Sequence, residues 1–481
     1  MVATAGLVAE EHHPVCLRVV RCSSVTGKDT ETAMDHSHHT HESSRPGGRR
    51  VRSRWWAVGL AGMTGLALTT VGVAAPAAGS RPGTLDRAST DNHRGEGSDK
   101  SKGQQESKGV PVPCDPHRLI AAIALANARG GAVLDLATKC TYTLTADIDG
   151  AGLPAISTPI TLNGGKHTTI TRAAAADEFR ILTVSANGRL TLSDLTITGG
   201  ASGNSGGGIL IDSGGAAAIN SSKIIRNVAN SGSSGGGIAN IGGALDIKNS
   251  SIVHNVAAGL GGGIFSVGTL SLYKSRIDTN TGGSGGGGLS ISGSFSISRS
   301  EIAENETPTG GGGIVIQGSG FGKIADTRIV KNVATGGQGG AAIFGAPGKL
   351  TISRSVIADN AATSGQGGAL FLAFGAMLVE DSVIKNNIGI NGGGIRNQGA
   401  TTLLRTKVTG NQATGLGGGI FNTDTGTLSL FTTKILKNIS VNPGGGIFNQ
   451  AGGTVNLNTA TGTTVVKNRP NNCVNVTGCP G

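Results

Sequence analysis

Large side chains are scarce in this sequence. Phe, Trp and Tyr make up 3% of the 481 residues, and charged residues make up 14%. This low aromatic content excludes several conventional hydrophobic cores packed around aromatic side chains. Glycine contributes 83 residues, more than twice its usual share of about 7%. The apolar residues are mostly Ile, Val, Leu and Ala, which suit short stacked strands whose turns use the conformational freedom of glycine.

Clusters of acidic residues are also lacking. Enzymes built on repetitive β-folds need calcium-binding Asp groups with an Arg base, or paired carboxylic acids. One position of the repeat described below instead carries a mixture of residue types: Arg226, His254, Thr279, Glu304, Lys331, Asp359, Asn386, Gly410, Lys437 and Lys467. We therefore expect no catalytic residue, metal site or cofactor. A secreted polysaccharide lyase or glycoside hydrolase remains the alternative.

The net charge of +11 is spread along the chain. Residues 1–110 hold 14 basic and 11 acidic groups, which leaves 26 and 18 for the rest. No basic stripe alternates with aromatic residues, so we expect no nucleic-acid partner. A diffuse positive surface is typical of a solvated exterior.

The first 111 residues divide into three segments. Residues 1–54 form a basic leader, in which Met34 offers an alternative start. Residues 55–78 are uncharged and end near an Ala75-Pro76-Ala77 cleavage pattern, as in a signal peptide, but they could also remain as a membrane anchor. Residues 79–111 are rich in Ser, Gly and charge, which predicts a disordered linker. Residues 112–481 would then lie outside the cytoplasm, and the membrane would be contacted only through residues 55–78.

Four cysteines bracket the exported region. An even number in an oxidising compartment predicts two disulfides, and a long solenoid would separate its ends. We expect Cys114 to pair with Cys140, and Cys473 to pair with Cys479.

A short repeat dominates residues 199–468. A Gly-rich stretch followed by an apolar pivot recurs at intervals of 25 to 29 residues, at Ile209, Ile238, Ile264, Leu289, Ile314, Ile343, Leu370, Ile395, Ile420 and Ile447. An L-x-L-like pair follows each pivot, and then a (Ser or Thr)-x-(Ile or Val)-x-x-Asn motif. These asparagines are Asn227, Asn255, Asn280, Asn305, Asn332, Asn360, Asn387, Asn411, Asn438 and Asn468. Each part alternates apolar and polar residues over three to five positions, as short strands do.

Three such strands would close one coil, and stacked coils would bury the apolar face that a single coil leaves exposed. The sequence therefore predicts an all-β protein, a right-handed parallel β-helix of about 12–13 coils, and we expect it to be a monomer. A short helix around Ile123 should cap its first coil. The repeated asparagines should form a structural ladder, since an amide can donate to one coil and accept from the other.

The motifs resemble the polymorphic outer-membrane protein repeat, which pairs a GGA-apolar motif with an aromatic-or-apolar-x-x-Asn motif. Val408 to Asn411 followed by QATGLGGGI matches in order and spacing, although Val or Ile stands where that family has Phe. The broader pattern resembles pectin-lyase-like β-helices. Members with this repeat act as surface adhesins, exported through a C-terminal translocating barrel that we do not recognise here. The resemblance implies the fold, and we do not expect that export route.

A phenylalanine directly follows five of the pivots, at Phe265, Phe344, Phe371, Phe421 and Phe448. If the pivots point inward, these rings would form a stripe on the outer face that could bind glycans or a partner protein. Alternatively, the local backbone turns the rings inward, or the linker of residues 79–111 covers them. We therefore expect a non-enzymatic extracellular or cell-surface rod, an adhesin-like scaffold that binds a cell-wall glycan, another extracellular glycan or a surface protein.

Overall fold

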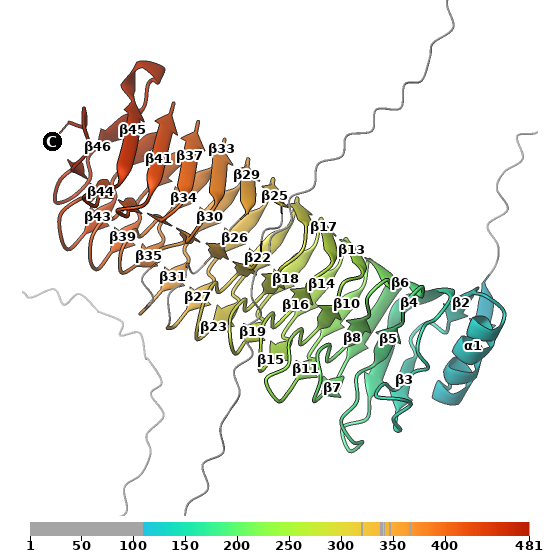
Figure 1. Cartoon of the computed structure of the whole chain (residues 1–481). Coiled ribbons are helices and arrows are strands. Elements are labelled where there is room, and N and C mark those ends of the chain that lie inside the picture. The colour runs from blue at the N-terminus through green and yellow to red at the C-terminus, as the bar shows by residue number, and fades with distance from the viewer. Residues whose placement is uncertain are drawn as a thin grey trace, which may run out of the picture. The chain divides into compact units, whose positions relative to one another are not determined.

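The described part of the chain is a parallel β-solenoid of about 13 turns (Figure 1). The structure, a computed structural model, describes residues 109–480 except 319–320, 337–339, 341, 346–347 and 365–366, and it does not place the side chain of Phe344. The predicted leader (1–54), the signal or anchor (55–78) and most of the predicted linker (79–108) lie outside the described residues. Among the residues that are described, no helix is long and apolar enough to cross a membrane.

The N-terminal cap consists of one strand and one helix. Strand β1 (Val110–Val112) pairs in parallel with β2 (Ala132–Leu136), so the predicted linker ends earlier than residue 111. In β1, Val112 is buried against the first coil. Helix α1 (Pro116–Ala128) begins after Asp115, whose side chain accepts the backbone N–H of His117 at 2.8 Å. Leu119 and Ile123 of α1 are fully buried, as a cap over the first coil requires.

A complete coil contains four strands, one more than the repeat predicted. The additional strand consists of the two residues after each repeated asparagine, for example Val256–Ala257, which pair with their equivalents in the adjacent coils. Two residues are too short to show any periodicity in a sequence. The fourth strand was therefore visible only once the coils were stacked.

The strands form three parallel sheets, which we call sheets 1, 2 and 3. Sheet 1 has two strips, because β4 (Pro159–Arg172) and β6 (Arg189–Thr198) run across both. The first strip continues through β9 (Ala216–Asn220), β13 (Ala244–Lys248), β17 (Thr269–Tyr273), β21 (Phe295–Ser298), β25 (Phe321–Ala325), β29 (Lys349–Ser353), β33 (Ala376–Glu380), β37 (Ala400–Leu404), β41 (Thr427–Phe431) and β45 (Thr454–Asn458). The second comprises β3 (Thr141–Leu144), β10 (Lys223–Ile225), β14 (Ser251–Val253), β18 (Arg276–Asp278), β22 (Glu301–Ala303), β26 (Arg328–Val330), β30 (Val356–Ala358), β34 (Val383–Lys385), β38 (Lys407–Thr409), β42 (Lys434–Leu436) and β46 (Thr464–Val466).

Sheets 2 and 3 are built from short strands. Sheet 2 contains β7 (Ala201–Ser202), β11 (Val228–Ala229), β15 (Val256–Ala257), β19 (Thr281–Gly282), β23 (Glu306–Thr307), β27 (Val333–Ala334), β31 (Ala361–Ala362), β35 (Ile388–Gly389), β39 (Gln412–Ala413) and β43 (Ile439–Ser440). Sheet 3 contains β5 (Leu182–Val184), β8 (Ile209–Ile211), β12 (Ile238–Asn240), β16 (Ile264–Ser266), β20 (Leu289–Ile291), β24 (Ile314–Ile316), β28 (Ile343–Gly345), β32 (Leu370–Leu372), β36 (Ile395–Asn397), β40 (Ile420–Asn422), β44 (Ile447–Asn449) and β47 (Cys473–Val474). Within the described ranges, one 3-10 turn forms, at Thr459–Thr461 between β45 and β46.

The core is a set of apolar columns that run along the solenoid axis. In one coil, Ile264, Leu270, Leu272 and Ile277 all point inward and are 0–3% exposed. Each stacks on its equivalent in the next coil, as Leu270 does on Phe295. The register places apolar residues of one coil on apolar residues of the next. Stacking therefore buries the apolar face of every coil except those at the two ends, which the caps must cover.

The ten repeated asparagines lie on top of one another at the corner between sheets 1 and 2, and all are buried. The side chain of Asn280 donates to Asn305 Oδ1 at 3.0 Å and to the carbonyl of Ile252 at 2.9 Å. Its own Oδ1 accepts the backbone N–H and the side-chain N–H of Asn255, both at 3.0 Å. Polar groups that would be costly to bury are thus satisfied along the column.

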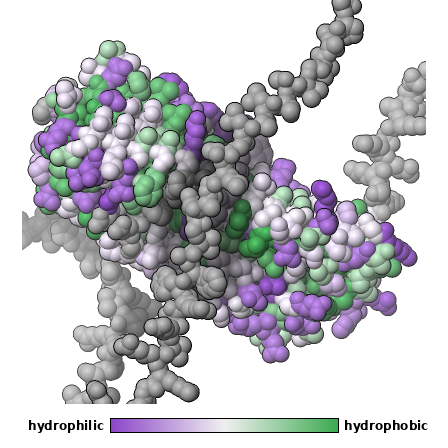
Figure 2. Space-filling view, in the orientation of Figure 1, coloured by the Kyte–Doolittle hydropathy of each residue, from purple (hydrophilic) through white to green (hydrophobic). Residues whose placement is uncertain are grey.

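Both predicted disulfides form. Cys114 and Cys140, with Cα atoms 5.7 Å apart, join the N-terminal cap to the first coil, and Cys473 and Cys479 close a small loop at the other end. Hydrophilic and hydrophobic residues are interspersed over the visible coloured surface of the solenoid (Figure 2).

Candidate functional site

The phenylalanines that follow the pivots do not form an exposed stripe. Phe371 and Phe421 are 3% and 7% exposed, and Phe265 and Phe448 are half-buried. The side chain of Phe344 lies outside the description. The expectation of solvent-exposed rings is therefore wrong for the two best-covered positions.

Glycine-rich loops explain this burial, because they fold back over the outer face of sheet 3. A Cβ atom on Gly417 would lie 2.9 Å from Phe421 Cα, and one on Gly444 would lie 2.7 Å from Phe448 Cβ. These contacts place the turns directly against the strand beside the rings. The first of the three glycines before each of these pivots permits this approach, since any side chain there would collide with the strand.

The covered rings stack with an arginine from the intervening coil. The register aligns Phe371, Arg396, Phe421 and Phe448 in one column. The Arg396 guanidinium lies 4.9 Å from the Phe371 ring centre and 5.9 Å from that of Phe421, and the rings of Phe421 and Phe448 are stacked at 5.5 Å. Burial lowers the pKa of Arg396. This geometry is that of a structural cation–π column.

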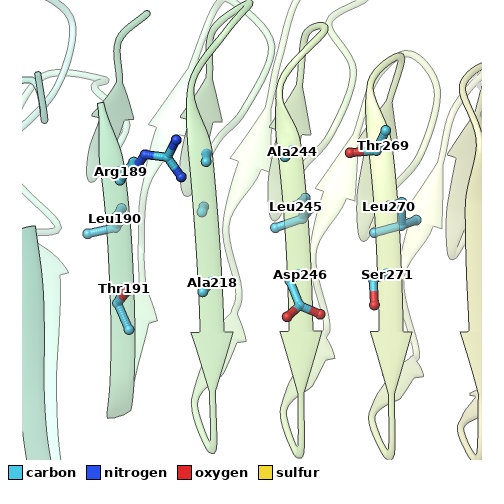
Figure 3. A pocket seen from close by; sticks show the side chains of 12 residues that line it. Arg189, Leu190, Thr191, Ala218, Ala244, Leu245, Asp246, Thr269, Leu270 and Ser271 are labelled. Atoms are coloured by element: carbon cyan, nitrogen blue, oxygen red, sulfur yellow. The ribbon is translucent and has the colours of Figure 1, made fainter. Parts of the chain in front are cut away.

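The outer face of sheet 1 offers a different candidate, a trough of about 380 Å³ over β6, β9, β13 and β17 (Figure 3). Two outward-facing rows line it. The first row is Arg189, Ala216, Ala244 and Thr269, and the second is Thr191, Ala218, Asp246 and Ser271. The trough exists because alanines occupy outward positions where neighbouring coils carry longer side chains. We call it the alanine trough.

One cation and one carboxylate border the alanine trough. Arg189 is exposed at one end, and Figure 3 shows its guanidinium on the β9 side. Asp246 lies on β13 and pairs through Oδ2 with Lys248. Its Oδ1 is enclosed and has no hydrogen-bond partner among the described residues, so a rotation of the carboxylate would present an acceptor to the trough.

The lining of the alanine trough offers polar groups but few acidic ones. Asp246 is the single carboxylate among its lining residues. Across the described residues, no group of three or more His, Cys, Asp or Glu side chains is placed to hold a metal ion. The mixed column predicted from the repeat is spread along one corner, with each residue in the left-handed region of φ, as at His254 (55°) and Thr279 (52°).

At the corner between the two strips of sheet 1, charged side chains of neighbouring coils form ion pairs along the solenoid axis. Arg354 binds Asp326 through two hydrogen bonds of 2.7 and 2.9 Å, and Arg405 binds Asp381 through bonds of 2.6 and 2.9 Å. The bound guanidinium lowers the pKa of each aspartate below its usual range.

The sequence reasoning missed the alanine trough and a buried arginine. The run Ala216-Ala217-Ala218 places small residues at two outward positions and at the first position of the L-x-L pair, whose second position keeps Ile219, and that interruption was the available signal. Arg180 is 6% exposed and donates to the carbonyls of Gly150 and Gly206 and to the hydroxyl of Ser202. Burial lowers its pKa, partly offset by Asp212 and Asp147. Arg180 links neighbouring coils through these hydrogen bonds, and we assign it no binding role.

Comparisons with protein-family models, with curated proteins and with solved structures gave no match.

Proposed function

We propose that this chain is an extracellular or cell-surface rod that binds carbohydrate, with the alanine trough as its binding site. The trough combines the groups that a sugar requires. Alanine methyl groups offer an apolar floor for the C–H face of a ring, while Arg189, Asp246 and the Ser and Thr hydroxyls can hydrogen-bond its hydroxyl groups. The observation that carries the proposal is this apolar floor between a cation and a carboxylate.

The extended sheet suits a polymer more than a compact ligand. The trough crosses four strands, which are spaced by about 4.8 Å, so it extends over roughly 15 Å. A segment of a glycan chain could lie along the solenoid axis across it. The resemblance of the repeat to polymorphic outer-membrane proteins, and of the solenoid to pectin-lyase-like β-helices, supports a role at a cell surface or on polysaccharides.

A pair of matched variants of the full chain tests the proposal on a panel of neutral and acidic glycans. Ala244→Leu fills the trough, whereas Ala400→Leu adds the same side chain to the same exposed column on β37, outside it. We expect Ala244→Leu to weaken binding of any glycan captured by the unmodified protein by about tenfold, equivalent to about 1.4 kcal/mol. Ala400→Leu should leave binding unchanged. Equal binding by both variants, or no glycan bound, would contradict the proposal.

The enzymatic alternative has its own assay. A lyase would release unsaturated products from acidic polysaccharides in the presence of calcium, which ultraviolet absorbance detects. We expect no increase in absorbance. A steady increase that Asp246→Asn abolishes would replace the binding proposal with a catalytic one.

A further inference from the structure

The net charge is not spread along the chain as first expected, because most of it is concentrated toward the C-terminal end of the solenoid. After Asp381, the sequence contains eight Lys and Arg residues and one acidic residue, Asp424. The four that follow Asp424 are Lys434, Lys437, Lys467 and Arg469. All four are exposed. The described ion pairs involve none of these four side chains.

Three of these cations line a single groove of about 510 Å³, together with Ile439 and Asn468. No acidic residue lines it. We call it the basic groove. It lies at the corner between sheets 1 and 2, where β43 and Arg469 form an isolated parallel bridge through Ile439.

The asparagine ladder places two lysines, which carry like charges, on adjacent coils in this groove. Lys437 and Lys467 directly precede ladder residues Asn438 and Asn468, whose side chains are hydrogen-bonded at 3.0 Å. Both lysines have left-handed backbones, with φ of 57° and 58°. Their backbones are therefore stacked about one strand spacing apart, roughly 4.8 Å, and their ammonium groups repel each other.

Earlier in the same column, the solenoid places opposite charges one coil apart. Glu304 and Lys331 precede ladder residues Asn305 and Asn332, and their side chains form an ion pair with an N–O distance of 3.4 Å. The same register therefore forms a pair where the charges are opposite, and leaves two cations unneutralised at the C-terminal end. An external anion would relieve this repulsion.

We propose that the basic groove binds carboxylate groups of an acidic glycan. Arg469 and the two lysines supply charge-assisted donors for carboxylates. Ile439 is 47% exposed beside them and offers apolar contact to the face of a sugar ring. No aromatic residue lines the groove, so it lacks the stacking platform on which single-stranded nucleic acids depend. This site is separate from the alanine trough and does not depend on it.

Binding of polygalacturonate to the full chain at low salt tests this inference. We expect Lys437→Gln/Lys467→Gln to weaken the affinity by about tenfold or more, because two charge-assisted contacts are lost. The matched control, Lys223→Gln/Arg226→Gln, removes two exposed cations from the other end, one of them in the same column. It should bind like the unmodified chain. Circular dichroism should show that both variants keep the fold.

Ligand controls separate charge from shape. Fully methyl-esterified polygalacturonate keeps the sugar backbone without its charges and should bind at least tenfold more weakly. Equal weakening by the control variant, equal binding of the methyl ester, or tighter binding of a single-stranded oligonucleotide would each overturn the inference. If Ala244→Leu abolished polygalacturonate binding and the lysine variant did not, the basic groove would be rejected while the trough proposal would stand.

Discussion

Asn305 and Asn332 are joined by two hydrogen bonds between neighbouring coils: the Asn305 side chain donates to Asn332 Oδ1 at 3.0 Å, and the Asn305 backbone N–H donates to the same oxygen at 3.1 Å. Asn305 Nδ2 also donates to the carbonyl of Ile277 at 3.0 Å. One side chain thus links three successive coils. The ladder depends on both halves of the amide, so removal of the whole amide should be informative.

Replacement of Asn305 by Ala should destabilise the solenoid by about 2–4 kcal/mol, because buried partners in adjacent coils lose their hydrogen bonds. Urea unfolding monitored by circular dichroism would measure the change. Asn456→Ala, at an exposed position on β45, should change the stability by less than about 0.5 kcal/mol. Equal effects of the two substitutions would show that the ladder contributes nothing specific.

Gly322 and Phe295 form a compensating pair in the core column of sheet 1. A Cβ atom on Gly322 would lie 2.2 Å from Phe295 Cζ, so the ring fills the space that a side chain would occupy. Gly322→Leu alone should cost about 1–3 kcal/mol through overpacking. Adding Phe295→Leu should recover much of this loss, since Leu270 and Leu350 occupy the same column. A double variant no more stable than the single one would contradict this packing.

The axial ion pairs predict a loss of stability in acid. Arg354 and Arg405 lower the pKa values of Asp326 and Asp381 below the ordinary value of 3.8. The unfolded chain therefore binds protons at higher pH than the folded chain does, and stability falls as the pH falls from about 4 through the lowered pKa values. Asp326→Asn/Asp381→Asn should reduce the difference between the melting temperatures at pH 7 and pH 3. An unchanged difference would show that solvent screening removes the effect.

The covered phenylalanines should affect stability and leave ligand binding intact. Phe421→Ala removes a buried ring stacked between Arg396 and Phe448, and it should destabilise the solenoid by about 3–5 kcal/mol. Phe374→Ala, at a ring that is 63% exposed, should have little effect. Glycan binding of the Phe421 variant, measured below its unfolding temperature, should match that of the unmodified chain. Selective loss of binding would return the aromatic column to the candidate sites.

Much of the fold could be predicted because the same short sequence pattern recurs in every coil of the repeat. The pivot, the L-x-L pair and the asparagine motif recur at nearly constant spacing, so stacking them in register follows from the burial of their apolar faces. The disulfide pairs followed from the separation of the two ends. The four-strand coil could not be predicted, because strands of two residues carry no periodicity.

The candidate sites depended on tertiary structure. The sequence by itself determined that the phenylalanines after the pivots share one column, since that is a matter of register. Only the folded chain decided that Phe371 and Phe421 are closed to solvent, because their burial depends on side chains of neighbouring coils and on turns whose close approach requires missing Cβ atoms. In the same way, Lys437 and Lys467 are 30 residues apart in sequence, and the stacking of coils places them side by side.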